Sequence, residues 1–136
     1  MILSDDPSRP VRRYFEEVHN HRAYAVMDEI FGSAWDLVAY KQFLFTLHQA
    51  FPDLQFTIDD QFIAGDKVVT RWTWQGHHQG TYASPLGSIA ATGRAVSGTG
   101  ITIDRIEGQR IIDRWFQADT LGLLQQMDVF ANLHLE

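Results

Sequence analysis

Two ionisable residues, His78 and Asp119, lie where predicted strands end. The imidazole of His78, with an unperturbed pKa of about 6.5, could orient a carbonyl group or move protons near neutral pH. Alternatively, it bonds to backbone where the strand becomes a loop. Asp119 could be an acid or base at the rim of a pocket, or the N-cap of the following helix, where backbone N–H bonds would keep it ionised. Because His77 and His78 point to opposite faces of a strand, we predict no metal site.

Aromatic side chains are the second group with a possible function. The sequence contains 4 Trp, 4 Tyr and 9 Phe, and such rings fill cores but also line pockets for flat apolar ligands. Trp72 and Trp74 share one face of a predicted strand, which makes them either pocket wall or core. Trp35 and Tyr40 lie at the start of a predicted helix. We expect these four residues, together with Phe116, to contact a substrate.

The apolar pattern has helical spacing in the first half of the chain and alternates in the second half. It predicts helices over residues 7–18, 24–31 and 36–50, and a short last helix that begins after Asp119. It predicts strands over 54–58, 68–78, 96–106 and 110–117, a turn at 107–109 and a long loop over 79–94. Helices followed by an antiparallel meander indicate an α+β fold in which the helices pack on one face of the sheet.

The predicted last hairpin is apolar on both faces. Ile101 and Ile103 share one face, and Ile106, Ile112 and Phe116 share the other. A strand that is covered on one face only should alternate cleanly between apolar and polar residues. We therefore expect helices on one face and a second subunit on the other, which predicts a homodimer.

The composition limits the class of protein. A chain of 136 residues fits a single domain. The net charge of -6 argues against a nucleic-acid partner, and the absence of cysteine excludes disulfides and thiolate metal sites within this sequence. No apolar run approaches the roughly 20 residues of a membrane helix, and the first residues lack the pattern of a signal peptide. We expect a cytoplasmic protein that does not bind membranes.

The elements and the residues between them resemble the SnoaL-like polyketide cyclases of the nuclear-transport-factor-two-like superfamily. The resemblance rests on residues 51–54, 65–66, 76–80, 92–94, 105–108, 115–119 and 121–127. It implies one domain over residues 1–136, with a curved antiparallel sheet that forms a cone, N-terminal helices on its concave face and a short C-terminal helix. It also implies a deep apolar cavity, a dimer, and enzymes that need no metal or organic cofactor.

The resemblance also shows where this chain departs from the family. The aldol cyclases of the family carry an aspartate where this chain has Phe116, and a glutamine and a histidine where it has Gly100 and Thr102. If these positions face the cavity, alternation places Asp104 and Arg114 there as well. The nearby guanidinium should lower the pKa of Asp104 and make it a base. Otherwise the two residues form a structural cross-strand ion pair.

Three functions remain open. The first is a cofactor-independent cyclase, isomerase or hydratase that acts by acid/base chemistry on a polyketide-like or other apolar carbonyl compound, with Asp119, His78, Asp104 and Arg114 as candidate catalytic residues. The second is a non-catalytic module of the same fold that binds a small molecule or serves as an accessory subunit, because fold does not fix function. The third is an epoxide-opening enzyme, which would need a carboxylate deep in the pocket to position water.

Overall fold

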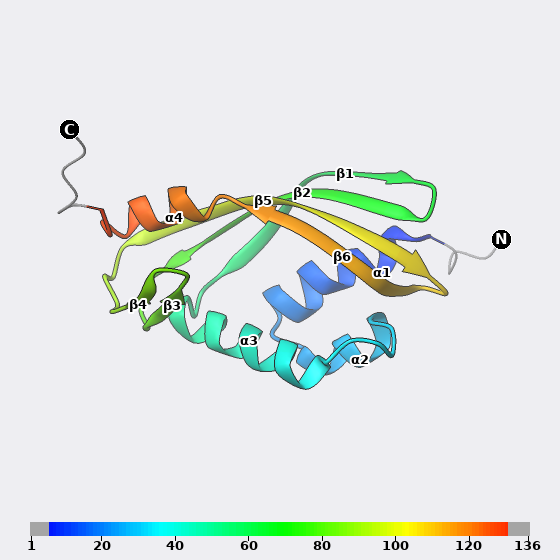
Figure 1. Ribbon diagram of the computed structural model, residues 1–136, viewed down its shortest axis with the longest axis horizontal. Helices are drawn as coiled ribbons and strands as arrows, with labels where there is room; N and C mark the ends of the chain where they lie inside the picture. The colour runs from blue at the N-terminus through cyan, green and yellow to red at the C-terminus, as the bar shows by residue number, and fades with distance from the viewer. Residues whose placement is uncertain (1–5, 131–136) are drawn as a thin grey trace.

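A computed structural model of the protein describes residues 6–130. Its main element is a four-stranded antiparallel sheet with the strand order β1-β2-β5-β6. The strands are β1 (Gln55–Ala64), β2 (Lys67–His77), β5 (Ala95–Glu107) and β6 (Arg110–Ala118). Figure 1 shows that this sheet is long and curved. The predicted α+β class and the antiparallel meander are confirmed.

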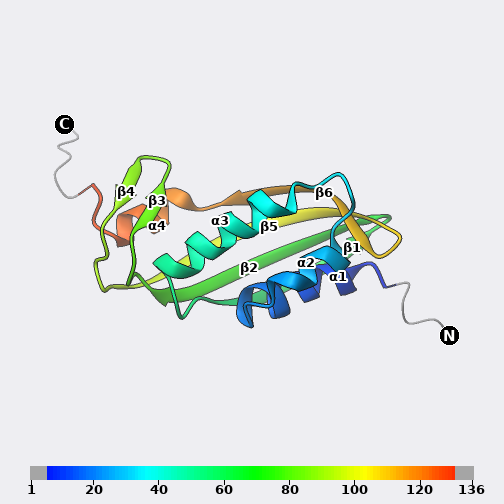
Figure 2. The same cartoon turned by 90° about the horizontal axis from the view of Figure 1, so that it is seen from below.

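The helices before the sheet cover one of its faces, as Figures 1 and 2 show from two directions. They are α1 (Ser8–Arg13), the π-helical turn η2 (Tyr14–Asn20), the 3₁₀ turn η3 (Tyr24–Val26), α2 (Met27–Ile30) and α3 (Leu37–Ala50). The side chain of Asp36 accepts a hydrogen bond from the N–H of Ala39 and begins α3, as an N-cap residue should. The short helix α4 (Thr120–Gln126) follows the sheet.

Tight turns set the register of the long strands. Strand β5 turns into β6 through Gly108 and Gln109, which have φ values of 58° and 62°. Two successive residues with positive φ are the signature of a type I′ turn, whose twist matches that of a hairpin. With a one-residue shift in the pairing between Arg105 and Ile106, Asp104 is paired with Arg114 across the two strands, and Thr102 with Phe116.

Two segments differ from the sequence prediction. Residues 79–94 are not entirely loop, because β3 (Tyr82–Ser84) and β4 (Gly87–Ile89) form a small hairpin. In β6, the pairing shifts by one residue after Arg105, so that Ile106 lies opposite Ile111. Ile111 is therefore the buried residue, with 0% exposure, whereas Ile112 falls at the bulge, has no partner on β5 and is half-buried. A one-residue bulge reverses the alternation, and the apolar pattern alone does not locate it.

The core lies between the helices and the concave face of the sheet. Val11 and Val18 from the first helical segment, Phe31 after α2 and Leu44 from α3 are all buried against strand residues such as Val68. Among residues 6–130, no helix is long and apolar enough to cross a membrane.

Candidate active site

A cavity of about 580 Å³ lies between the helices and the concave face of the sheet. Most of its wall is apolar or aromatic, and it includes Trp72, Trp74 and Phe56 from the sheet and Leu44 and Leu47 from α3. Its buried polar residues are Tyr14, His19, Thr102 and Arg114. A mainly apolar cavity with a few convergent polar groups is the usual form of a small-molecule site.

Two glycines of β5 make room for the tryptophans of β2. A Cβ atom at Gly100 would lie 2.3 Å from the ring of Trp72, and one at Gly98 would lie 2.2 Å from the ring of Trp74. The indole N–H of Trp72 donates to Oγ1 of Thr102 at 2.8 Å. The Trp72 ring thus fills the space beside positions 100 and 102. At these positions the resemblance described above implies polar groups in the aldol cyclases.

Asp104 and Arg114 form a buried ion pair. Nε of Arg114 donates to Oδ1 of Asp104 at 2.5 Å, and the two side chains are 0% and 5% exposed. The guanidinium lies 4.0 Å from the centre of the Tyr14 ring, a distance suited to a cation–π contact. Arg114 lines the cavity, whereas Asp104 lies behind it and is no part of the cavity wall. The inward orientation predicted for both residues is correct, but Asp104 contacts the cavity only through Arg114.

The expected direction of the Asp104 pKa shift is wrong. Burial raises the pKa of Asp104, and Arg114 offsets only part of that effect. The physical reason is that Oδ2 of Asp104 has no hydrogen-bond partner among the described residues, so one contact must compensate for removing the whole carboxylate from water. Burial alone would lower the pKa of Arg114, but Asp104 and the neighbouring tyrosines outweigh it and the pKa rises. Arg114 therefore stays charged.

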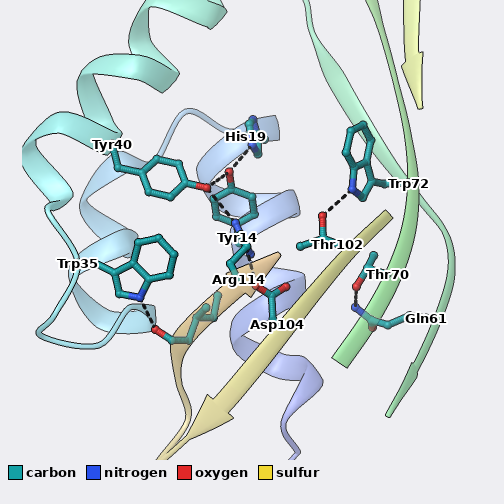
Figure 3. A network of polar contacts seen from close by, with 11 residues as sticks. Tyr14, His19, Trp35, Tyr40, Gln61, Thr70, Trp72, Thr102, Asp104 and Arg114 are labelled. Atoms are coloured by element: carbon teal, nitrogen blue, oxygen red, sulfur yellow. Dashed lines mark hydrogen bonds and ion pairs between the residues drawn. The ribbon is translucent and has the colours of Figure 1, made fainter. Parts of the chain in front are cut away.

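A chain of polar contacts leads from this ion pair into the helices (Figure 3). Nη1 of Arg114 donates to the hydroxyl of Tyr40 at 3.0 Å. The hydroxyls of Tyr40 and Tyr14 are 2.8 Å apart, and that of Tyr14 is 3.0 Å from Nε2 of His19. Burial raises the pKa of Tyr14, so its hydroxyl stays protonated. Of these residues, sequence reasoning selected only Tyr40 and Arg114 as site residues, and it missed Tyr14 and His19.

The π-helical turn explains why Tyr14 and His19 were missed. In an α-helix, with about 3.6 residues per turn, residues five apart point to different sides. In a π-turn, hydrogen bonds join residues five apart, and such turns occur often at functional sites. Because η2 has this geometry from Tyr14 to Asn20, the two side chains meet at the cavity. The signal in the sequence is the interruption of helical spacing at His19-Asn20-His21.

The chain of contacts continues beyond the cavity wall. Nδ1 of His19 is 3.1 Å from Nε2 of His48 on α3, and Nδ1 of His48 is 2.5 Å from the hydroxyl of Tyr24. Burial, followed by the charge of His48, holds the pKa of His19 well below its usual range. Burial also lowers the pKa of His48 to about 4. Both imidazoles are therefore neutral near pH 7.

The other predicted site residues occupy different places. His78 is 0% exposed and lies outside the cavity wall, where its Nδ1 lies 3.0 Å from Oγ1 of Thr92 and accepts from the N–H of the same residue at 3.3 Å. Its position fits the structural alternative, a histidine bonded to backbone at the end of a strand. Asp119 lines the mouth of the cavity and caps α4 by accepting from the N–H of Gly122 at 2.8 Å.

The two remaining aromatic candidates line the cavity. Phe116 is 63% exposed, so it borders the mouth of the cavity. Trp35 lies deeper, and its indole N–H donates to the carbonyl of Ile111 at 2.9 Å. Trp35 also packs against the ring of Tyr40, with 5.9 Å between the ring centres. It thereby supports one of the polar residues of the site.

Comparison with known proteins assigns the chain to a family. The profile of the family described as SnoaL-like polyketide cyclase matches residues 6–127. The chain belongs to this family. Among curated proteins, none matches the chain.

Solved structures share the fold of this SnoaL-like protein. A protein from Acidithiobacillus ferrooxidans, provisionally assigned as a polyketide cyclase, is 27% identical, covers 95% of this chain and 99% of its own, and has a TM-score of 0.75. TsrD from Streptomyces laurentii is 24% identical over 93% and 98% of the two chains, with a TM-score of 0.78. AclR from Streptomyces galilaeus, provisionally assigned as a hydroxylase, is 17% identical over 91% and 96%, with a TM-score of 0.79. The last two likenesses concern the fold alone.

Proposed function

We propose that this SnoaL-like protein is an enzyme that acts by acid/base chemistry, without an added cofactor, on a polyketide-like or other apolar carbonyl compound. The observation that carries this proposal is the cluster of Arg114, Tyr40 and Tyr14 at the buried polar side of an otherwise aromatic cavity. These three side chains place a guanidinium and two hydroxyl groups together, where they can act on one ligand oxygen.

The chemistry follows from the charges of these groups. Nη2 of Arg114 is buried and has no partner among residues 6–130, so the guanidinium would act on a ligand as a positive charge beside the cavity and through the hydroxyl of Tyr40, to which Nη1 donates. When a carbonyl compound loses a proton from its α-carbon, negative charge develops on that oxygen. A fixed cation and hydroxyl donors in an apolar cavity stabilise such charge more strongly than water does. Asp104 acts through Arg114, which it holds in position, and Asp119 remains the candidate carboxylate at the mouth of the cavity.

A second function also has support. The cavity has an aromatic side chain at Phe116 and no acid or base at Gly100 or Thr102, which suits a module that binds a small molecule without changing it. The epoxide-opening alternative loses its basis, because the carboxylate on which it depended, Asp104, is not part of the cavity wall.

Hydrogen–deuterium exchange at carbon separates the two remaining functions. The purified protein would be incubated in D₂O with 2-tetralone and aromatic 1,3-diketones, and binding and deuterium uptake at the α-carbon would be measured. We expect the protein to accelerate uptake. Tyr40→Phe should slow it by about a hundredfold, the scale of losing one donor to a developing oxyanion, and Asp104→Asn should slow it because Arg114 loses the carboxylate that holds it in position.

The control is His77→Gln, which removes an exposed histidine that pairs with Asp53 outside the cavity. This variant should exchange deuterium at the rate of the unmodified protein. If compounds bind but none takes up deuterium faster than in buffer, the protein is a binding module and the enzyme proposal fails.

A further inference from the structure

A continuous line of hydrogen bonds joins the cavity to the far side of the helical layer. It runs from Tyr40 to Tyr14, His19, His48 and Tyr24, through contacts of 2.8, 3.0, 3.1 and 2.5 Å. The chain begins at the cavity wall, but His48 and Tyr24 are not part of that wall. Tyr24 is half-buried, on the turn η3. We propose that these five residues conduct protons between a ligand at Tyr40 and solvent at Tyr24.

The donors and acceptors of this chain fit only two arrangements. Arg114 can only donate, so the oxygen of Tyr40 accepts from it. If Tyr40 donates to Tyr14, Tyr14 must donate to Nε2 of His19. Both histidines then carry their proton on Nδ1, and Tyr24 donates to water. If the order is reversed, both histidines carry it on Nε2, and the hydroxyl of Tyr40 points to the ligand. A neutral histidine pair joined Nδ1 to Nε2 must share one tautomer.

Transfer of one proton converts the first arrangement into the second. A ligand C–H or O–H bond breaks, its electron pair stays on the ligand, and its proton binds to the oxygen of Tyr40. Tyr40 passes its own proton to Tyr14, Tyr14 to Nε2 of His19, and His19 its Nδ1 proton to Nε2 of His48. His48 gives its Nδ1 proton to Tyr24, which releases one to water. Each residue ends with the number of protons it had, and the reverse sequence returns a proton to the ligand.

The surroundings of the histidines suit this role. His19 faces Tyr14 and Arg114 on the cavity side and His48 on the other, and His48 also faces Tyr24. Arg22 donates to the backbone carbonyl of His19 and to that of Leu54, so its positive charge lies beside the pair. Burial and this charge disfavour protonation of either ring. Each ring therefore keeps one N–H and one bare nitrogen, as a chain of this kind requires.

The tautomers test the chain without a substrate. Two-dimensional ¹⁵N–¹H spectra of the histidine rings would be recorded near pH 7 for the full chain. We expect His19 and His48 to be neutral and to share one tautomer. Tyr40→Phe leaves Tyr14 only His19 as acceptor and should fix both rings with the proton on Nδ1. Tyr24→Phe removes the outer acceptor and should fix both rings with the proton on Nε2.

Tyr82→Phe is the matched control, because among residues 6–130 the hydroxyl of Tyr82 takes no part in this chain. It should leave both rings unchanged. The proposal is overturned if the two rings carry different tautomers, if either is charged near pH 7, or if Tyr40→Phe and Tyr24→Phe leave the rings in the same tautomer. Because each variant removes one hydroxyl and retains the aromatic ring, we expect both to fold.

Proton transfer between this chain and a ligand rests on the proposed function and is measured separately. If the protein exchanges the α-hydrogens of 2-tetralone, Tyr24→Phe should slow uptake by about tenfold or more while leaving the dissociation constant of the ketone unchanged. Uptake that this variant does not alter overturns the relay and leaves the enzyme proposal intact. Conversely, the two histidines could share one tautomer in a protein that exchanges no ketone. That result would support the hydrogen-bonded chain and contradict the proposed function.

Discussion

At the scale of single residues, the site combines one buried ion pair with two neutral histidines. Asp104 and Arg114 are held out of water together, and removing one partner of such a pair is costly because it leaves an uncompensated charge. His19 and His48 are buried without a carboxylate in contact in the described chain. Protonation of either ring would place a positive charge close to Arg114 or Arg22.

This arrangement predicts how stability depends on pH. The pKa of His48 is lowered to about 4 in the folded protein from 6.5, so between these values the unfolded chain binds more protons. The free energy of unfolding should therefore rise as pH increases from about 4 to 6.5, by about 3 kcal/mol at most from this residue. The contribution is complete above pH 6.5 and is lost as pH falls towards 4. Urea denaturation at several pH values measures it.

Other groups titrate in the same range, and His19 acts in the same direction. The difference between the unmodified protein and His48→Gln therefore reports His48 together with its effect on the pKa of His19. We expect a smaller slope for the variant, and parallel curves would contradict the assignment of a neutral buried histidine.

At the scale of elements, helix ends and turns decide which groups reach the cavity. The π-turn η2 brings Tyr14 and His19 together, and the start of α4 places Asp119 at the cavity mouth. The carboxylate of Asp119 already accepts a backbone N–H. An N-cap role and an acid/base role therefore compete to explain this residue.

Two substitutions at Asp119 separate these roles. Asparagine is nearly as good an N-cap as aspartate, whereas alanine costs about 1 kcal/mol. We expect Asp119→Asn to retain the free energy of unfolding and Asp119→Ala to lose about that amount. If the carboxylate also exchanges protons with a ligand, Asp119→Asn should slow deuterium uptake about a hundredfold. Unchanged uptake in Asp119→Asn restricts the residue to capping.

At the scale of the whole molecule, the convex face of the sheet carries an apolar row. Cross-strand pairing places Phe62 beside Val69, Val69 beside Ile103 and Ile103 beside Trp115. Phe62 and Trp115 are 56% and 52% exposed. The helices cover the opposite face, so this row has no covering element within the described chain.

We propose that a second copy of the chain covers this row and forms a homodimer. Light scattering after size-exclusion chromatography should give twice the mass of the chain. Trp115→Glu, at the exposed end of the row, should shift the protein to the monomer because a charge there would be buried without a partner. Val38→Glu, on the exposed side of α3 (83% exposed), is the control and should leave the mass unchanged. A monomeric unmodified protein would exclude this interface.

The sequence was sufficient to predict the main helices, the four long strands and the inward direction of several cavity residues. Helical and alternating periods are local, so they indicated α3 with its cap at Asp36 and the burial of Trp72 and Trp74. Strand pairing then placed Asp104 opposite Arg114. The exact pairing also depends on the bulge between Arg105 and Ile106, which the apolar pattern does not locate.

Tertiary structure alone decided the electrostatics and the polar chain of the site. The pKa of Asp104 depends on how completely its carboxylate is removed from water, and no spacing in the sequence measures that. The contact between Tyr14 and His19 depends on a π-turn, and that between His19 and His48 joins residues 29 apart in the chain. Such contacts form only when separate helices pack together, because hydrogen bonds need a fixed distance and direction in space.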